Sequence, residues 1–270
     1  MKIDVLLVPV GARYPEMRAA AIAAEEAGYD GVWTWDHLRD PDEAADPGVP
    51  EAWTVLTALA EATRRVALGP LVLNTGLRHP GVLANMAATL QQVSGGRLLL
   101  GLGAGATPSM AYAREQTALG MTVPGDRMRA ERVGETAQVL RRLWSGDDSG
   151  FTGTQFHLDR PSGYLRPDPP PPIVVGGFGP RMAAIAGRYG DGFNTQAMHP
   201  DLAELARVAR SAHQASGRDP ARFSLSVFAG LGDRWLRPDT PERARLERVG
   251  VDRLILLTQP PYAPLLKGRL

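Results

Sequence analysis

The sequence predicts an α/β fold, a (β/α)₈ barrel, and three observations carry that prediction. Short apolar runs alternate with longer segments of helical periodicity, the apolar runs number eight, and 270 residues is a usual length for eight such units. Buried strands that are each followed by a helix form a parallel sheet. A doubly wound open sheet has the same order of elements, so connectivity alone leaves that alternative open.

The expected strands are short, rich in Val, Leu and Ile, and bounded by Gly, Pro or Asp. In chain order they cover residues 3–9, 31–36, 66–74, 97–105, 172–177, 191–196, 222–230 and 251–258. The expected helices between them repeat apolar residues at helical spacing, as in the first, which Pro15 opens and Gly28 ends. They cover residues 15–30, 51–65, 79–95, 126–146, 180–190, 200–217 and 240–250, and a short segment follows the last strand.

Two stretches depart from this repeat, and we expect both to be insertions. Residues 106–125, after the fourth strand, form a looser segment before the long helix. Residues 150–172, before the fifth strand, contain a hairpin-like pattern and end in four consecutive prolines, which cannot continue a helix. With these insertions, residues 1–270 are expected to form a single barrel domain.

The composition excludes several classes of function. A net charge of +1 gives no electrostatic footprint for nucleic acid, and the absence of cysteine excludes disulfides and thiolate metal sites. No apolar run approaches the roughly 20 residues of a membrane span, and the N-terminus has no cleavable leader pattern. We therefore expect a cytoplasmic protein that binds neither nucleic acid nor a membrane. Only Lys2 and Lys267 among the 30 basic residues are lysines, a hint of a GC-rich bacterial source.

Two titratable residues, Asp36 and His37, stand where the second strand ends. Active sites of (β/α)₈ barrels lie at the carboxyl ends of the strands, so this position favours a catalytic pair. An adjacent Asp and His also commonly form a helix cap or a turn. Arg78 and His79 follow the third strand and could line the same mouth or cap the third helix.

Glycine-rich runs end the fourth and fifth strands. GLGAG, at 101–105, could admit a planar cofactor or simply allow close packing at the barrel mouth. GGFGPR, at 176–181, leads into a helix whose free N–H groups suit a phosphate, although many such helix starts bind nothing. The remaining histidines lack partners at metal-ligand spacing, so we expect no metal. These parts suit a cofactor that brings its own chemistry.

Taken together and in order, five segments resemble the luciferase-like monooxygenase superfamily, and within it the branch that uses the deazaflavin coenzyme F420. They are AEEAGYDGVWTWDHL, EAWTVLTALAEATRRVALG, HPGVLANMAATLQQVSGGRLLLGLGAG, DRMRAERVGETAQVLRRLW and PPPPIVVGGFGPRMAAIAGRYGDGFN. The similarity spans nearly the whole chain. SGGRLLLGLGAG with the later GGFGPR and GDGF is specific to the superfamily, and the Asp–His pair favours the deazaflavin branch.

The resemblance implies a site for each part of the coenzyme. The residue matching His37 lies near the reactive ring carbon, with the acid matching Asp36 beside it, and a bulge matching Leu71, Val72 and Asn74 backs the ring, often through a non-prolyl cis peptide. The remaining cofactor contacts that it implies, to the ring and the phosphate, are Gly103, Gly105, Gly176, Gly177, Phe178 and Gly179. The two insertions would wall the substrate pocket. Many members dimerise through the second and third helices, so we expect a homodimer.

The implied reaction is hydride transfer between coenzyme F420 and a small organic substrate. His37 would act as general base for an alcohol, or as general acid for an enone or imine, and Asp36 would orient it or stabilise its charge. Adjacent side chains of a strand point to opposite faces, so that role of Asp36 requires a loop conformation.

One departure argues against one activity of the branch. Its sugar-phosphate dehydrogenases carry a catalytic Glu directly after the glycines of the fourth strand, where this chain has Ala106. Three alternatives to F420-dependent hydride transfer stay open: a monooxygenase using reduced FMN and O₂, a non-catalytic flavin or deazaflavin carrier, and a barrel without cofactor.

Overall fold

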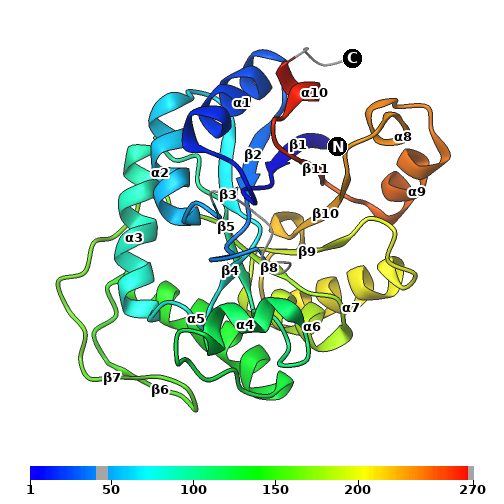
Figure 1. Ribbon diagram of the computed structural model, residues 1–270. Coiled ribbons are helices and arrows are strands. Elements are labelled where there is room, and N and C mark those ends of the chain that lie inside the picture. The colour runs from blue at the N-terminus through cyan, green and yellow to red at the C-terminus, as the bar shows by residue number, and fades with distance from the viewer. Residues whose placement is uncertain (41–47, 267–270) are drawn as a thin grey trace.

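The computed structural model describes residues 1–40 and 48–266, and its parallel strands curl into a barrel surrounded by helices (Figure 1). The strand order is β3-β2-β1-β11-β10-β9-β8-β5-β4, with parallel pairing throughout. A parallel bridge between Leu68 and Leu98 joins the β3 edge to the chain just before β5. The predicted (β/α)₈ barrel is confirmed. Of the two lysines, Lys267 lies outside the residues that the structure describes.

All eight expected strands form, but the third is divided in two. The barrel strands are β1 (Lys2–Leu7), β2 (Gly31–Thr34), β3 (Ala67–Pro70), β4 (Leu73–Asn74), β5 (Leu100–Gly103), β8 (Ile173–Gly176), β9 (Gly192–Gln196), β10 (Ser224–Gly230) and β11 (Arg253–Thr258). Between β3 and β4 the chain passes through Leu71 and Val72, which are joined by a cis peptide bond as the family resemblance implied. β3 therefore pairs with β2, whereas β4 pairs with β5.

The seven expected helices form with ordinary end signals. They are α1 (Tyr14–Glu26), α2 (Ala52–Ala62), α3 (Pro80–Val93), α5 (Asp126–Ser145), α6 (Pro180–Tyr189), α7 (Leu202–Ala215) and α9 (Pro241–Val249). Glu51 caps α2 by accepting from Trp53 N and Thr54 N, and His79 caps α3 by accepting from Gly81 N, which supports the capping interpretation of that histidine. Gly146, with φ of +77°, ends α5 in the left-handed conformation.

Short helical elements lie in the loops. They are η1 (Ala111–Ala113) and α4 (Arg114–Thr117) in the first insertion, η2 (Pro220–Arg222) and α8 (Asp233–Leu236) near β10, and α10 (Ala263–Leu266) near the end of the chain.

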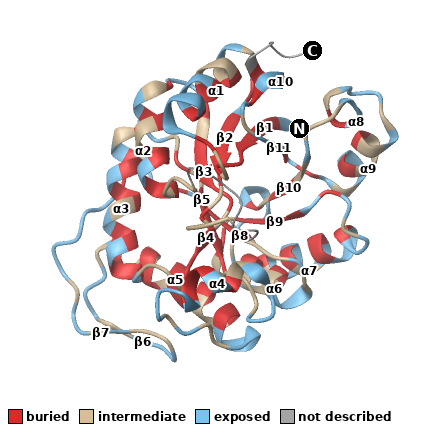
Figure 2. Ribbon diagram, in the orientation of Figure 1, coloured by how far each residue is buried: buried red, intermediate tan, exposed pale blue. Residues whose placement is uncertain are grey.

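Two apolar layers form the core, as expected for side chains that alternate along a strand. Val5 and Leu7 of β1 pack outward against the helices, whereas Leu6 packs inward with Trp33 and Ile255 inside the barrel. Figure 2 shows buried residues along the strands and the inward faces of the helices. The helix ring and the barrel interior together hold the strand ends in fixed positions, which is what a site at those ends requires.

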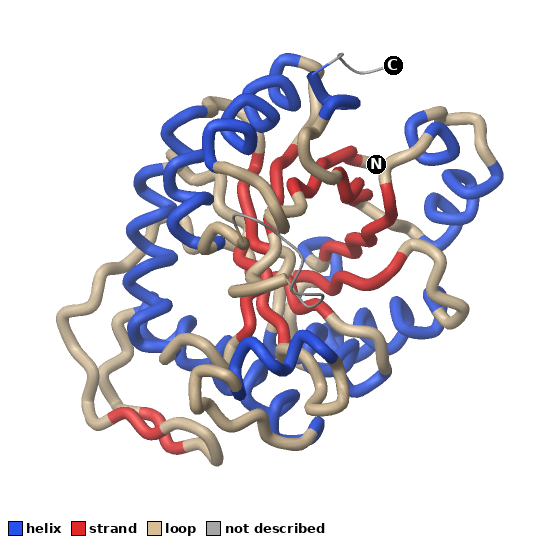
Figure 3. Tube along the Cα trace, in the orientation of Figure 1, coloured by secondary structure: helices blue, strands red, loops and turns tan. Residues whose placement is uncertain are grey.

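The second insertion forms an arm beside α3 and α5, with a hairpin of β6 (Phe151–Thr152) and β7 (His157–Leu158) (Figures 1 and 3). Glu135 of α5 holds it, because its carboxylate accepts from the N–H groups of Thr154, Gln155 and Phe156 and from the Thr154 hydroxyl. Burial alone would raise the pKa of Glu135, but these hydrogen bonds outweigh burial and lower it.

Candidate functional site

A cavity of about 410 Å³ opens at the carboxyl ends of the barrel strands. It contains nearly all of the residues that the sequence pointed to: Asp36, His37, Leu71, Val72, Asn74, Gly103, Gly105, Gly176, Gly177 and Phe178. Gly179 is not part of the lining and is instead the N-cap of α6. Aromatic and sulfur-containing side chains also line it: Trp35, Met110, Tyr112, Met182 and Phe228.

The imidazole of His37 is held by the first insertion. Its Nδ1 lies 3.2 Å from Glu115 Oε2 and 3.3 Å from Glu115 Oε1. The Tyr112 ring stacks on it with centroids 4.0 Å apart, and Trp35 meets its edge at 5.8 Å. Glu115 is only 3% exposed and also accepts a hydrogen bond from Leu38 N at 2.9 Å. The site thus contains a buried carboxylate paired with an imidazole.

Asp36 was expected beside His37, but its carboxylate pairs with Arg78 instead. Its carboxylate accepts from Arg78 Nη1 at 2.6 Å and Nη2 at 2.8 Å, and from Asn74 N at 2.8 Å. β2 ends at Thr34, and beyond it the two neighbouring side chains diverge, so the carboxylate beside His37 is that of Glu115. The geometry gives Asp36 the task of tying the β2 end to β4 and to the loop that follows it.

Arg78 completes this tie. It bonds both Asp36 and Glu51, the latter at 2.6 Å, and its side chain is 13% exposed. Burial alone would lower the pKa of Arg78, but the two carboxylates outweigh burial and raise it. Arg78 therefore lies behind the mouth of the barrel and fixes the backbone there.

The glycines of the fourth strand are required by close packing. A Cβ on Gly103 would lie 2.3 Å from Val72 Cγ2. A Cβ on Gly105, whose φ is +71°, would lie 2.5 Å from Asn74 Oδ1. The packing explanation for GLGAG therefore applies, and Gly103, Gly105 and Val72 form a close-packed cradle in the lining of the cavity.

The start of α6 is open toward solvent. Gly179 has no heavy atom within 4 Å of a built Cβ, and Pro180 follows it at the first helical position. The N–H groups of a first helical turn lack intrahelical partners. Gly177 N is different, because it donates to Asn194 O at 3.0 Å. Free amides at this end therefore come from the α6 turn rather than from Gly177.

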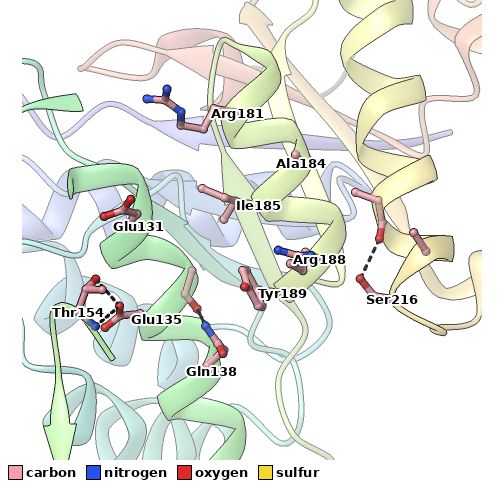
Figure 4. A pocket seen from close by; sticks show the side chains of 13 residues that line it. Glu131, Glu135, Gln138, Thr154, Arg181, Ala184, Ile185, Arg188, Tyr189 and Ser216 are labelled. Carbon is pink, nitrogen blue, oxygen red and sulfur yellow. Dashed lines mark hydrogen bonds between the residues drawn. The ribbon is translucent and has the colours of Figure 1, made fainter. Parts of the chain in front are cut away.

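Another large hollow, about 910 Å³, lies on the outside of the helix ring (Figure 4). Its lining comes mainly from α5, α6 and α7, and in Figure 4 Arg181 extends from the first turn of α6. Glu135 lines this hollow, but its carboxylate already accepts hydrogen bonds from the hairpin. None of the predicted site residues lines this hollow, so the cavity at the strand ends is the candidate site.

Residues 1–40 and 48–266 contain neither a metal-binding cluster nor a membrane-spanning helix. No group of three or more His, Asp or Glu side chains is arranged to hold a metal ion. No helix in the same residues combines the length and the apolar character needed to cross a bilayer.

Glu115 and Tyr112, which both contact His37, are among the lining residues that the sequence did not indicate. Their segment has no clear periodicity, and Glu115 is 78 residues from His37 in the chain. The sequence indicated only that the insertion containing them, residues 106–125, would border the substrate pocket.

The sequence profile of the luciferase-like monooxygenase family matches residues 2–247. The F420-dependent hydroxymycolic acid dehydrogenase of Mycobacterium tuberculosis is 36% identical over 225 residues, which are 82% of this chain and 60% of that protein. The F420-dependent glucose-6-phosphate dehydrogenase of Kineococcus radiotolerans is 36% identical over 211 residues, 77% of this chain and 60% of the relative. The chain thus spans about 60% of the length of these curated relatives.

Solved structures share the fold at lower identity. An F420-dependent secondary alcohol dehydrogenase in complex with an F420–acetone adduct has a TM-score of 0.81 and 23% identity, covering 96% of this chain and 94% of that one. The coenzyme F420-dependent tetrahydromethanopterin reductase from Methanopyrus kandleri has a TM-score of 0.78 and 17% identity, covering 100% and 98%. These likenesses show a common barrel.

Proposed function

The chain belongs to the luciferase-like monooxygenase family, and we propose that it is an F420-dependent oxidoreductase that transfers a hydride between the coenzyme and a small organic substrate. The single observation that carries the proposal is the imidazole of His37, held by Glu115 in a cavity whose lining also contains the glycine and valine cradle. The relatives named above, both F420-dependent dehydrogenases, support the choice of coenzyme.

The residues present fit a deazaflavin. Leu71 and Val72 would back the ring, and Val72 packs so closely on Gly103 that this part of the lining has no room for a side chain at 103. The glycines at 103, 105, 176 and 177 would line the ring and its side chain. The backbone at Phe178 and Gly179, just before α6, and the free N–H groups of the first turn of α6 would hold the phosphate. When bound, the coenzyme supplies a ring carbon that gives or accepts a hydride.

His37 would hold or move the substrate proton. Its Nδ1 is engaged by Glu115, which leaves Nε2 as the nitrogen available to a hydroxyl or carbonyl. Positioned proton transfer by a histidine contributes about 10² to 10⁴ to a rate. Trp35, Tyr112 and Phe228 would exclude water and favour a substrate with apolar surface. Asp36 would act indirectly, through Arg78 and the backbone of Asn74.

We also propose a homodimer of single-domain subunits. The outer side of α2 and α3, which the family resemblance identifies as a contact face, carries Val82 at 59% exposure. Next to it, a hollow of about 700 Å³ is lined by α2, α3 and the hairpin arm. Sedimentation velocity tests this proposal, and a monomer at micromolar concentration would contradict it. The cytoplasmic location and the bacterial source expected from the sequence stay predictions.

Titration with oxidised F420, and separately with FMN, tests the function directly through quenching of cofactor and tryptophan fluorescence. We expect micromolar or tighter binding of F420 and weaker binding of FMN. A preference for FMN would favour oxygen chemistry, and binding of neither would refute the proposal. His37→Ala should keep F420 binding and lose turnover by about 10² to 10⁴. Turnover within a few fold of wild type would exclude His37 as the acid–base group, and tight F420 binding without turnover of any alcohol, ketone or enone would favour a carrier.

A further inference from the structure

The first insertion brings a buried carboxylate and an aromatic ring to the same imidazole. Glu115 meets the edge of His37 at 3.2 Å, and Tyr112, three residues earlier, covers one face with ring planes 24° apart. Both come from the consecutive elements η1 and α4. Because Leu38 N also donates to Glu115, the carboxylate is held at 2.9 Å by the backbone next to the histidine. Edge and face contacts together determine where the imidazole points.

We propose that Glu115 is a positioning residue that fixes the neutral tautomer of His37, with the proton on Nδ1 and the lone pair on Nε2. This inference rests on the proposed function for the chemistry that follows. An ionised carboxylate accepts hydrogen bonds and cannot donate them, so the contact at Nδ1 requires a proton on that nitrogen. The unprotonated Nε2 is then the nitrogen that can take a proton from a substrate.

The step balances in the direction of alcohol oxidation. The hydroxyl proton would pass to His37 Nε2, and the C–H bond of the carbon that bears the hydroxyl would break, so that its hydrogen leaves as a hydride to the oxidised deazaflavin. The products are a carbonyl compound, the reduced coenzyme and an imidazolium. The imidazolium forms 3.2 Å from the Glu115 carboxylate, where the opposite charge stabilises it. In the reverse direction the imidazolium returns the proton to the carbonyl oxygen.

Asp36 does not compete for this role. Its carboxylate is occupied by both guanidinium nitrogens of Arg78 and by Asn74 N. Glu115 instead contacts the imidazole and accepts a hydrogen bond from the backbone next to it. The two carboxylates thus have separate tasks, one on the backbone of the barrel mouth and one on the proton-transfer group.

The first test measures the tautomer in the protein without coenzyme. Long-range ¹H–¹⁵N spectra of histidine-labelled protein resolve the imidazoles of five histidines, and His37→Asn assigns the signal. We expect the neutral wild-type ring to carry its proton on Nδ1. Glu115→Gln keeps the size of the side chain and an acceptor for Leu38 N, and we expect it to mix the two tautomers. A wild-type proton on Nε2, or an unchanged tautomer in Glu115→Gln, would overturn the proposal.

The second test separates positioning from simple anchoring of the insertion. In steady-state assays with F420, Glu115→Gln should lower kcat about 10- to 1000-fold and change KM by less than a few fold. Glu135→Gln is the matched control, because Glu135 also anchors an insertion through backbone N–H groups but contacts no histidine. Equal losses of kcat in both variants would overturn the proposal. Absence of hydride transfer in wild type, with the expected tautomer, would refute the proposed function and leave the positioning of His37 standing.

Discussion

Replacing Arg78 by Met should destabilise the protein mainly through the carboxylate left behind. Arg78 donates to Asp36 at 2.6 and 2.8 Å, and the Asp36 side chain is 1% exposed. Breaking a buried ion pair costs about 3–5 kcal/mol, because one charge stays buried without its partner. The link to Glu51, whose side chain is 41% exposed, adds less than about 1 kcal/mol. Asn74 N still bonds Asp36, so we expect a loss near the lower limit, about 3 kcal/mol.

Urea denaturation followed by tryptophan fluorescence measures this loss. The informative comparison is a cycle of Arg78→Met, Asp36→Asn and the double variant. The double variant removes both charges, so its loss should be smaller than the sum of the single losses by about 2 kcal/mol. A loss below about 1 kcal/mol for Arg78→Met, or additive losses in the cycle, would refute the assignment of Asp36 to a structural tie.

Two further expectations concern packing and pH. Gly103→Ala, whose Cβ would lie 2.3 Å from Val72, should lower the free energy of unfolding by about 1–3 kcal/mol and weaken F420 binding. Gly179→Ala, with open space around it, should change the free energy of unfolding by less than about 0.5 kcal/mol. Equal losses of stability in Gly103→Ala and Gly179→Ala would contradict the close packing of Gly103 on Val72. The pKa of Glu135 is lowered in the folded protein, because the hydrogen bonds from residues 154–156 outweigh burial, so its stabilisation is present above about pH 4.3 and lost as pH falls through the folded-state value. The difference in unfolding free energy between wild type and Glu135→Gln should therefore shrink on acidification, and a constant difference from pH 7 to 3 would contradict this.

The order of strands and helices was predictable because each strand is a short buried run with a helix after it. The division of the third strand was not visible in its apolar pattern, and only the family resemblance pointed to Leu71 and Val72. The pairing of Asp36 with Arg78 spans 42 residues and that of His37 with Glu115 spans 78. Local spacing carries no information about such contacts. The sequence therefore located the mouth and about half of its lining, but it did not indicate that the carboxylate in contact with the imidazole is that of Glu115.

Under the proposed function, the short segment from Ala111 to Thr117 would affect both the range of substrates and the rate of reaction. Loops at a barrel mouth are the parts that vary most readily, and exchanging one usually alters only what the pocket accepts. Here the same exchange would also remove Tyr112 and Glu115 from the imidazole. Replacing this segment by that of a relative would therefore lower the rate of reaction as well as change the substrates accepted, unless Tyr112 and Glu115 are both retained. A library that varies Met110, which lines the cavity at 50% exposure, offers a route to new substrates that leaves proton transfer intact.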